Sequence, residues 1–174
     1  VCSTTFLPRL FSQYILVLGR SGCDQLKAYA QRLLEMGSSR WSVFSMSDLT
    51  NLLYNKPGFL ERHAHWRDTS PEAIQGLEDL ARELIIRAAK LCALLAYATI
   101  CNQLKERSSF TVALDSSLAR ETPLFISVLR DTLLEISPYR KRVELLLVEP
   151  LALPGGEITV PMLGSANAID TLAK

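Results

Sequence analysis

The chain has 174 residues, of which 48% are hydrophobic and 21% are charged, a balance typical of one globular domain with a sizeable buried core. Its formal net charge is +1, so no global charge imbalance favours nucleic acid, an anionic membrane or an acidic partner. The apolar runs are shorter than the ~18 residues that suggest a membrane span, so we expect none.

The first predicted unit is a short buried strand that leads through a glycine turn into an amphipathic helix. Residues 14–18 form a continuously apolar run of the kind that is buried in a parallel sheet. Apolar residues at helical spacing then extend over residues 24–36, and Gly37 follows them as a helix stop. A strand, a glycine turn and a helix in this order are how a phosphate-binding loop begins.

The residues of that turn form the candidate cofactor-binding site: Gly19, Arg20, Ser21, Gly22 and Cys23. Their backbone N–H groups, near the positive end of a helix dipole, could hold a phosphate. Where a Walker A sequence has its last glycine, lysine and hydroxyl, however, the chain has Asp24, Gln25 and Leu26. Aspartate repels phosphate, and the other two side chains supply neither a cation nor a magnesium ligand. We therefore expect an ordinary turn rather than a working phosphate loop.

A second strand is predicted over residues 41–46, and Asp48 follows it. A carboxylate at the end of a strand could act as a general base toward a substrate hydroxyl, so Asp48 is the candidate catalytic residue. Alternatively, Ser47 or Asp48 caps the helix that the chain enters at Leu49. We favour capping, and the two roles are compatible.

The middle of the chain is predicted as an irregular connection followed by the longest helix. Residues 55–69 are polar, aromatic and interrupted by a Pro-Gly pair. His63 and His65 lie two residues apart in this segment, but without a third ligand we prefer an exposed loop and predict no metal site. A helix is predicted over residues 70–107, because its first residues are a hydroxyl cap, a proline and an acid.

A third strand, over residues 110–114, leads into a polar turn. The candidate substrate-binding residues lie there: Asp115, Ser117 and Arg120. These side chains could orient a substrate, although aspartate and serine are also common in turns and caps. A helix over residues 123–136 and a fourth strand over residues 143–148 follow. Between them, the basic triplet 140–142 is interpreted as a solvated turn.

Strands that alternate with helices, joined by connections long enough for crossovers, predict a mostly parallel sheet with helices on both faces, a three-layer α/β fold. We expect a single domain over residues 1–174, with a core over about 13–150. The remainder, 151–174, is predicted to be irregular, apart from a small edge strand at 158–160 and a short terminal helix at 165–174. Ligands of such sheets bind beyond the carboxyl ends of the strands, so we expect the three polar turns to converge on one crevice.

The order of these features resembles the zeta-toxin-like branch of P-loop kinases. The resemblance matches residues 19–26 to the phosphate loop, Asp48 to the base, residues 70–107 to the long helix and residues 110–120 to an acid-Gly-Thr-like turn with an arginine. It implies a three-layer P-loop-kinase-like fold, with ATP and Mg²⁺ in an active member. The chain departs from the family at the loop lysine and hydroxyl, at Ser116 in place of glycine, and in lacking an arginine-bearing lid.

Two main hypotheses follow. The first is a catalytically inactive P-loop-kinase-like domain without a cofactor, which acts as a structural or interaction subunit with other protein subunits as partners. The alternative is a small-molecule or nucleotide-sugar kinase with a divergent phosphate-binding loop, which uses ATP, Mg²⁺ and Asp48 as the base. A nucleotide sensor without turnover is a third option. The four cysteines show no metal-ligand spacing, which favours an intracellular, reducing compartment and leaves cytoplasm or organelle open.

Overall fold

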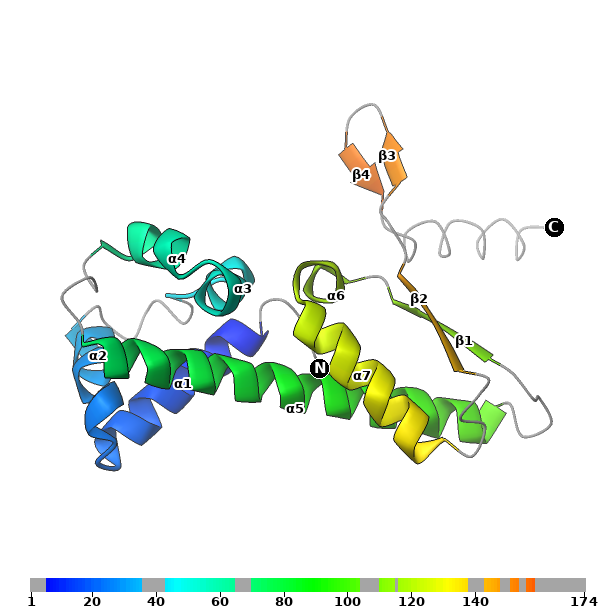
Figure 1. The fold of residues 1–174 in the computed structure, drawn as a ribbon, viewed down its shortest axis with the longest axis horizontal. Helices are drawn as coiled ribbons and strands as arrows, with labels where there is room; N and C mark the ends of the chain where they lie inside the picture. The colour runs from blue at the N-terminus through cyan, green and yellow to red at the C-terminus, as the bar shows by residue number, and fades with distance from the viewer. Residues whose placement is uncertain are drawn as a thin grey trace, which may run out of the picture. The chain divides into compact units, whose positions relative to one another are not determined.

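The computed structural model divides the chain into two compact units, Val1–Leu91 (the N-terminal unit) and Cys92–Lys174 (the C-terminal unit). The boundary falls inside the long helix α5 (Pro71–Gln103), one continuous green ribbon in Figure 1. The prediction of a single domain over residues 1–174 stays a prediction. The residues that the structure describes are 6–35, 43–64, 70–103, 110–114, 116–137, 143–147, 151–153 and 156–158.

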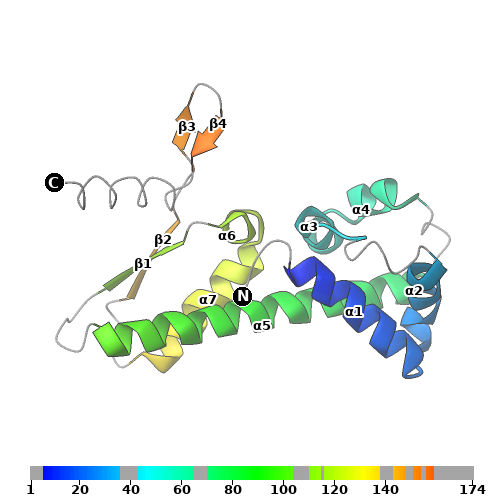
Figure 2. The ribbon, with the colours of Figure 1, turned by 180° about the vertical axis from the view of Figure 1, so that it is seen from behind.

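Helices dominate the described residues of the N-terminal unit. They are α1 (Phe6–Arg20), α2 (Asp24–Glu35), α3 (Met46–Tyr54), α4 (Lys56–Arg62) and the first part of α5. α1 lies beside α5 in Figures 1 and 2, and α1 also packs closely against α2. The core of the unit consists of buried side chains at helical spacing, among them Leu7, Phe11, Ile15, Leu49, Leu52, Leu77, Ala81 and Ile85.

The strand predicted over residues 14–18 is wrong, because these residues belong to α1. Phe11 and Ile15 are fully buried one turn apart, whereas Val17 is 57% exposed. A strand of a parallel sheet buries consecutive side chains on both faces, while a surface helix buries one stripe. Five apolar residues are too few to separate these cases by periodicity, and the buried stripe begins upstream at Leu7.

The strand predicted over residues 41–46 is wrong in its described part. Residues 43–45 form no strand, α3 begins at Met46, and residues 41 and 42 lie outside the described residues. Phe44 is buried and meets Phe11 edge to face, with the ring centroids 5.0 Å apart. The segment therefore contributes an aromatic side chain to a helical core instead of a strand to a sheet.

Capping residues set the starts of the next two helices. α4 forms inside the segment predicted as irregular, residues 55–69, where the side-chain oxygen of Asn55 accepts the backbone N–H three residues on at 3.3 Å. α5 begins where the sequence predicts, since Ser70 Oγ accepts from the Ala73 N–H at 3.2 Å. Residues 104–107 of the predicted helix lie outside the described residues.

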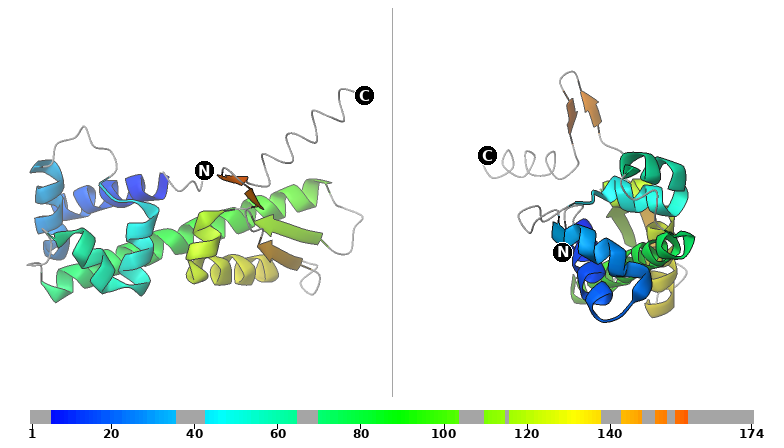
Figure 3. Two further views of the ribbon diagram at one scale, coloured as in Figure 1. Left: turned by 90° about the horizontal axis from the view of Figure 1, so that it is seen from above. Right: turned by 90° about the vertical axis from the view of Figure 1, so that its left-hand side faces the viewer.

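The C-terminal unit contains every described strand. Its elements after α5 are β1 (Phe110–Leu114), α6 (Ser117–Glu121), α7 (Pro123–Ile136), β2 (Val143–Leu147), β3 (Leu151–Leu153) and β4 (Gly156–Ile158). β1 and β2 pair in parallel, with Phe110 opposite Val143, and β3 and β4 form a separate antiparallel pair. α7 belongs to the crossover that a parallel pair requires, and it lies along one side of that pair in Figures 1 and 3.

The predicted three-layer α/β fold with a P-loop-kinase-like parallel sheet is wrong. The described residues are mostly helical, and their parallel strands are β1 and β2 alone. Besides α5, four predicted elements are confirmed. The helices over 24–36 and 123–136 are α2 and α7, and the strands over 110–114 and 143–148 are β1 and β2. The edge strand predicted at 158–160 shares only Ile158, the last residue of β4, with the structure. The terminal helix predicted over 165–174 lies outside the described residues.

Candidate functional site

The predicted site residues lie in three segments of the chain. The turn at residues 19–23 and Asp48 belong to the N-terminal unit, whereas Ser117 and Arg120 belong to the C-terminal unit. Asp115 lies outside the described residues. The convergence of these segments on one crevice stays a prediction.

Residues 19–23 connect two helices rather than a strand and a helix. α1 ends at Arg20, and Gly22 has a positive φ of 96°. The Cys23 N–H donates to the Leu18 carbonyl oxygen at 3.0 Å, a 6→1 bond of the Schellman type that closes a helix C-terminus. Gly22 therefore occupies the left-handed position after the helix, where glycine is favoured because other residues are strained there.

Gly19 allows the close packing of α1 on α2. A Cβ at this position would lie 2.5 Å from the Ala30 Cβ and 2.9 Å from the Leu26 carbonyl oxygen, so a side chain would force the two helices apart. Ser21 also serves the end of α1, because its Oγ donates to the Val17 carbonyl oxygen at 2.8 Å. The glycines and the serine that suggested a phosphate loop thus have structural explanations.

The geometry overturns the interpretation of residues 19–23 as a P-loop. A phosphate loop follows a strand and presents the N–H groups of the next helix to the ligand. Here the preceding element is the C-terminal end of α1, which carries partial negative charge, and Asp24 begins α2. Both features disfavour an anion. Any other ligand contact of these residues stays a prediction.

Asp48 lies in a buried polar cluster built by α3, α4 and the residues that flank them. Its side chain is 4% exposed. Oδ2 accepts from the backbone N–H and from the hydroxyl of Ser45, both at 2.7 Å. Oδ1 accepts from Arg62 Nη1 at 3.1 Å and lies 3.2 Å from His63 Nε2. Ser45 Oγ accepts from the Asp48 N–H at 3.2 Å, which completes a capping box at the start of α3.

These contacts determine the charge state of Asp48. Burial alone would raise the pKa of its carboxyl group, but the hydrogen bonds from His63, Ser45 and Arg62 outweigh burial and hold that pKa well below its ordinary range. A carboxylate with several donors and a lowered pKa is a weak proton acceptor. The geometry therefore favours the capping role, with Ser45 as the cap in place of Ser47.

His63 is buried, in contrast to the exposed loop that we expected from the sequence. Its side chain is 7% exposed, and its ring centroid lies 5.4 Å from that of Phe44 and 4.8 Å from that of Phe59. His65 lies outside the described residues. Within the described part of the chain, no three His, Cys, Asp or Glu side chains gather where a metal ion could bind.

Glu78 is a buried carboxylate that sequence reasoning missed. Its side chain on α5 is 10% exposed, and its oxygens lie 2.5 Å from Lys56 Nζ and 2.9 Å from Arg82 Nη2. The hydrogen bond from Lys56 is the largest cause that lowers the pKa of Glu78. The four-residue spacing to Arg82 is visible in the sequence, whereas the contact with Lys56 depends on the packing of α4 on α5.

The residues after β1 begin a short helix at the carboxyl end of a parallel strand. Ser116 has an extended backbone, with φ −156° and ψ 130°, and its carbonyl oxygen accepts from the Arg120 N–H at 3.1 Å. Leu118 and Ala119 are buried, while the Arg120 side chain is exposed. Because β1 and β2 are parallel, their carboxyl ends lie at one edge, which is where parallel sheets bind ligands.

The sequence was compared with models of known protein families to identify the family of this chain. The family model described as hexokinase matches residues 1–156, which is most of the chain. The chain belongs to the hexokinase family. Hexokinases have an actin-like fold, so the resemblance to zeta-toxin-like P-loop kinases is overturned. No curated protein matches the chain.

The membrane prediction can be compared with the helices directly. Across the described ranges, no helix combines the length and the hydropathy that crossing a membrane requires. The longest helix, α5, carries charged side chains throughout its first half.

Proposed function

We propose that the chain is a domain of a sugar kinase, which transfers a phosphoryl group from a nucleoside triphosphate to a hydroxyl group of a hexose. The observation that carries the proposal is the hexokinase match over residues 1–156. It favours the kinase alternative over an inactive scaffold, but without a divergent P-loop. The hexose and the nucleotide are part of the proposal.

The sequence argument for inactivity loses its basis in this family. That argument relied on the missing lysine and hydroxyl of a Walker A loop at residues 19–26. Because those residues are the end of α1 and the start of α2, a Walker lysine there would have no phosphate to contact. Its absence therefore says nothing about whether the protein phosphorylates a sugar.

We place the ligand-binding residues of the C-terminal unit in the turn that follows β1. Phosphoryl transfer depends on positioning and on charge stabilisation. Asp115 supplies a carboxylate that could accept a proton from a sugar hydroxyl, Ser117 supplies a hydroxyl group, and Arg120 supplies a guanidinium for phosphate oxygens. The support for this placement is the position of the turn, at the carboxyl end of one strand of a parallel pair.

The residues of this turn also fit the magnesium ion that accompanies ATP. Mg²⁺ prefers oxygen ligands and is usually held by one or two carboxylates together with the phosphates of the substrate. Asp115 and the hydroxyl groups of Ser116 and Ser117 form an all-oxygen donor set of this type. The ion would neutralise the charge of the nucleotide phosphates.

Asp48 is assigned a structural role in this proposal. Its two oxygens are already within hydrogen-bond distance of donors on Ser45, Arg62 and His63. A base must be free to accept a proton from the substrate, and a lowered pKa makes acceptance less favourable. We therefore expect Asp48 to fix the relation between α3 and α4 rather than to take part in phosphoryl transfer.

The expected compartment and partners enter the proposal as well. Among the described residues, Cys23 and Cys101 are free thiols, which supports an intracellular, reducing compartment. Leu146 and Leu147 of β2 are 52% and 43% exposed, which supports contact with further protein, such as another subunit. Fractionation of cells and native mass spectrometry of the endogenous protein test these two points.

The direct test is hexose-dependent formation of ADP from MgATP by the natural full-length polypeptide that contains this chain. Glucose, mannose and fructose are the sugars to compare, each with a control that lacks the sugar. We expect ADP formation that depends on at least one hexose. Stabilisation by MgATP without turnover would instead indicate a sensor. If MgATP gave no stabilisation and none of the three sugars gave turnover, the result would favour the hypothesis of an inactive scaffold instead.

A further inference from the structure

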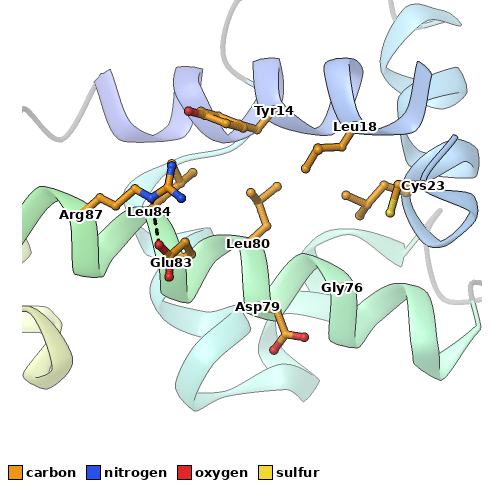
Figure 4. Close-up of a pocket in the computed structure, with 10 residues that line it drawn as sticks. Tyr14, Leu18, Cys23, Gly76, Asp79, Leu80, Glu83, Leu84 and Arg87 are labelled. Atoms are coloured by element: carbon orange, nitrogen blue, oxygen red, sulfur yellow. Dashed lines mark hydrogen bonds and ion pairs between the residues drawn. The ribbon is translucent and has the colours of Figure 1, made fainter. Parts of the chain in front are cut away.

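We draw no further inference here: the strongest candidate, the mostly apolar cavity of about 390 Å³ between α1 and α5 (Figure 4), carries nothing, because its Arg87 is already paired with Glu83 of the same lining and nothing in the structure shows what covers the apolar walls.

Discussion

Two carboxylates that look alike in the sequence, Asp48 and Asp115, follow segments that fold differently. Both follow an apolar run that predicts a strand, and both were candidates for chemistry. The run before Asp48 forms no strand in its described part, and Asp48 becomes part of a buried capping cluster. The run before Asp115 is the strand β1 of a parallel pair, whereas Asp115 itself lies outside the described residues. The preceding element is therefore the difference that the structure shows between the two, and the ligand-binding role that we propose for Asp115 rests on it.

A large effect on catalysis is expected at Arg120, in the turn after β1. If the guanidinium stabilises charge on the transferred phosphoryl group, Arg120→Gln should lower kcat by about 10²–10³-fold. The side chain is exposed, so the free energy of unfolding should change by no more than about 0.5 kcal/mol. Steady-state kinetics with MgATP and the preferred hexose, together with urea unfolding, measure both. An unchanged kcat would remove Arg120 from the proposed site.

The Asp48 cluster is expected to show the opposite pattern. Asp48→Asn removes the charge that Arg62 and His63 face and replaces one acceptor of Ser45 with a donor, so it should destabilise the protein by about 2–4 kcal/mol. Urea unfolding of the variant and the wild type checks this value. Ser47→Ala is the matched control, because Ser47 is the alternative cap that the structure does not use, and it should cost little. Equal losses in both variants would contradict the assignment of the capping box.

The stability that Asp48 contributes should depend on pH. The pKa of its carboxyl group is lower in the folded state than the ordinary value near 3.9 of the unfolded chain, so the unfolded state binds the proton more readily. The contribution is thus fully present above about pH 4 and is lost as the pH falls below that value toward the folded pKa. The difference in unfolding free energy between wild type and Asp48→Asn should narrow between pH 6 and about pH 3. If this difference in unfolding free energy grew on acidification, the result would contradict the lowered pKa of Asp48.

The two glycines near the end of α1 test the correction of the phosphate loop. Gly19→Ala should cost about 1–3 kcal/mol, because the added methyl meets Ala30 and the Leu26 carbonyl oxygen. Gly22→Ala should cost about 1 kcal/mol, because only the positive φ opposes it and no atom lies within 4 Å of the added methyl. Thermal unfolding measures both values. If either variant instead lost nucleotide affinity at unchanged stability, the turn would bind ligand after all.

Much of the fold can be predicted from local signals. α5 begins at its hydroxyl cap and proline, and β1, β2, α2 and α7 coincide with apolar patterns of the expected period. The failures occur where a short apolar run has no period of its own. Residues 14–18 belong to a buried stripe that starts at Leu7, and the run before α3 is cut short by the cap at Ser45. The wrong strand over residues 14–18 then suggested a wrong phosphate loop, and the wrong strand before Asp48 suggested a catalytic base, which stays a prediction.

The candidate sites divide in the same way. The turn with Ser117 and Arg120 can be proposed from the sequence, because a real strand precedes it. The cavity between α1 and α5 and the contact of Lys56 with Glu78 join residues more than twenty positions apart, and no local pattern predicts such pairs. The family itself came from comparison over residues 1–156, not from any short motif that we recognised.

The most direct test of the account is to measure kcat and the free energy of unfolding for Asp115→Asn and Asp48→Asn side by side in the natural full-length polypeptide that contains this chain. We predict that Asp115→Asn lowers kcat by about 10²–10⁴-fold and leaves the free energy of unfolding nearly unchanged. Asp48→Asn should lower the free energy of unfolding and leave kcat per folded molecule within about threefold of the wild type. The reverse result, with the loss of kcat at Asp48 and the loss of stability at Asp115, would contradict it.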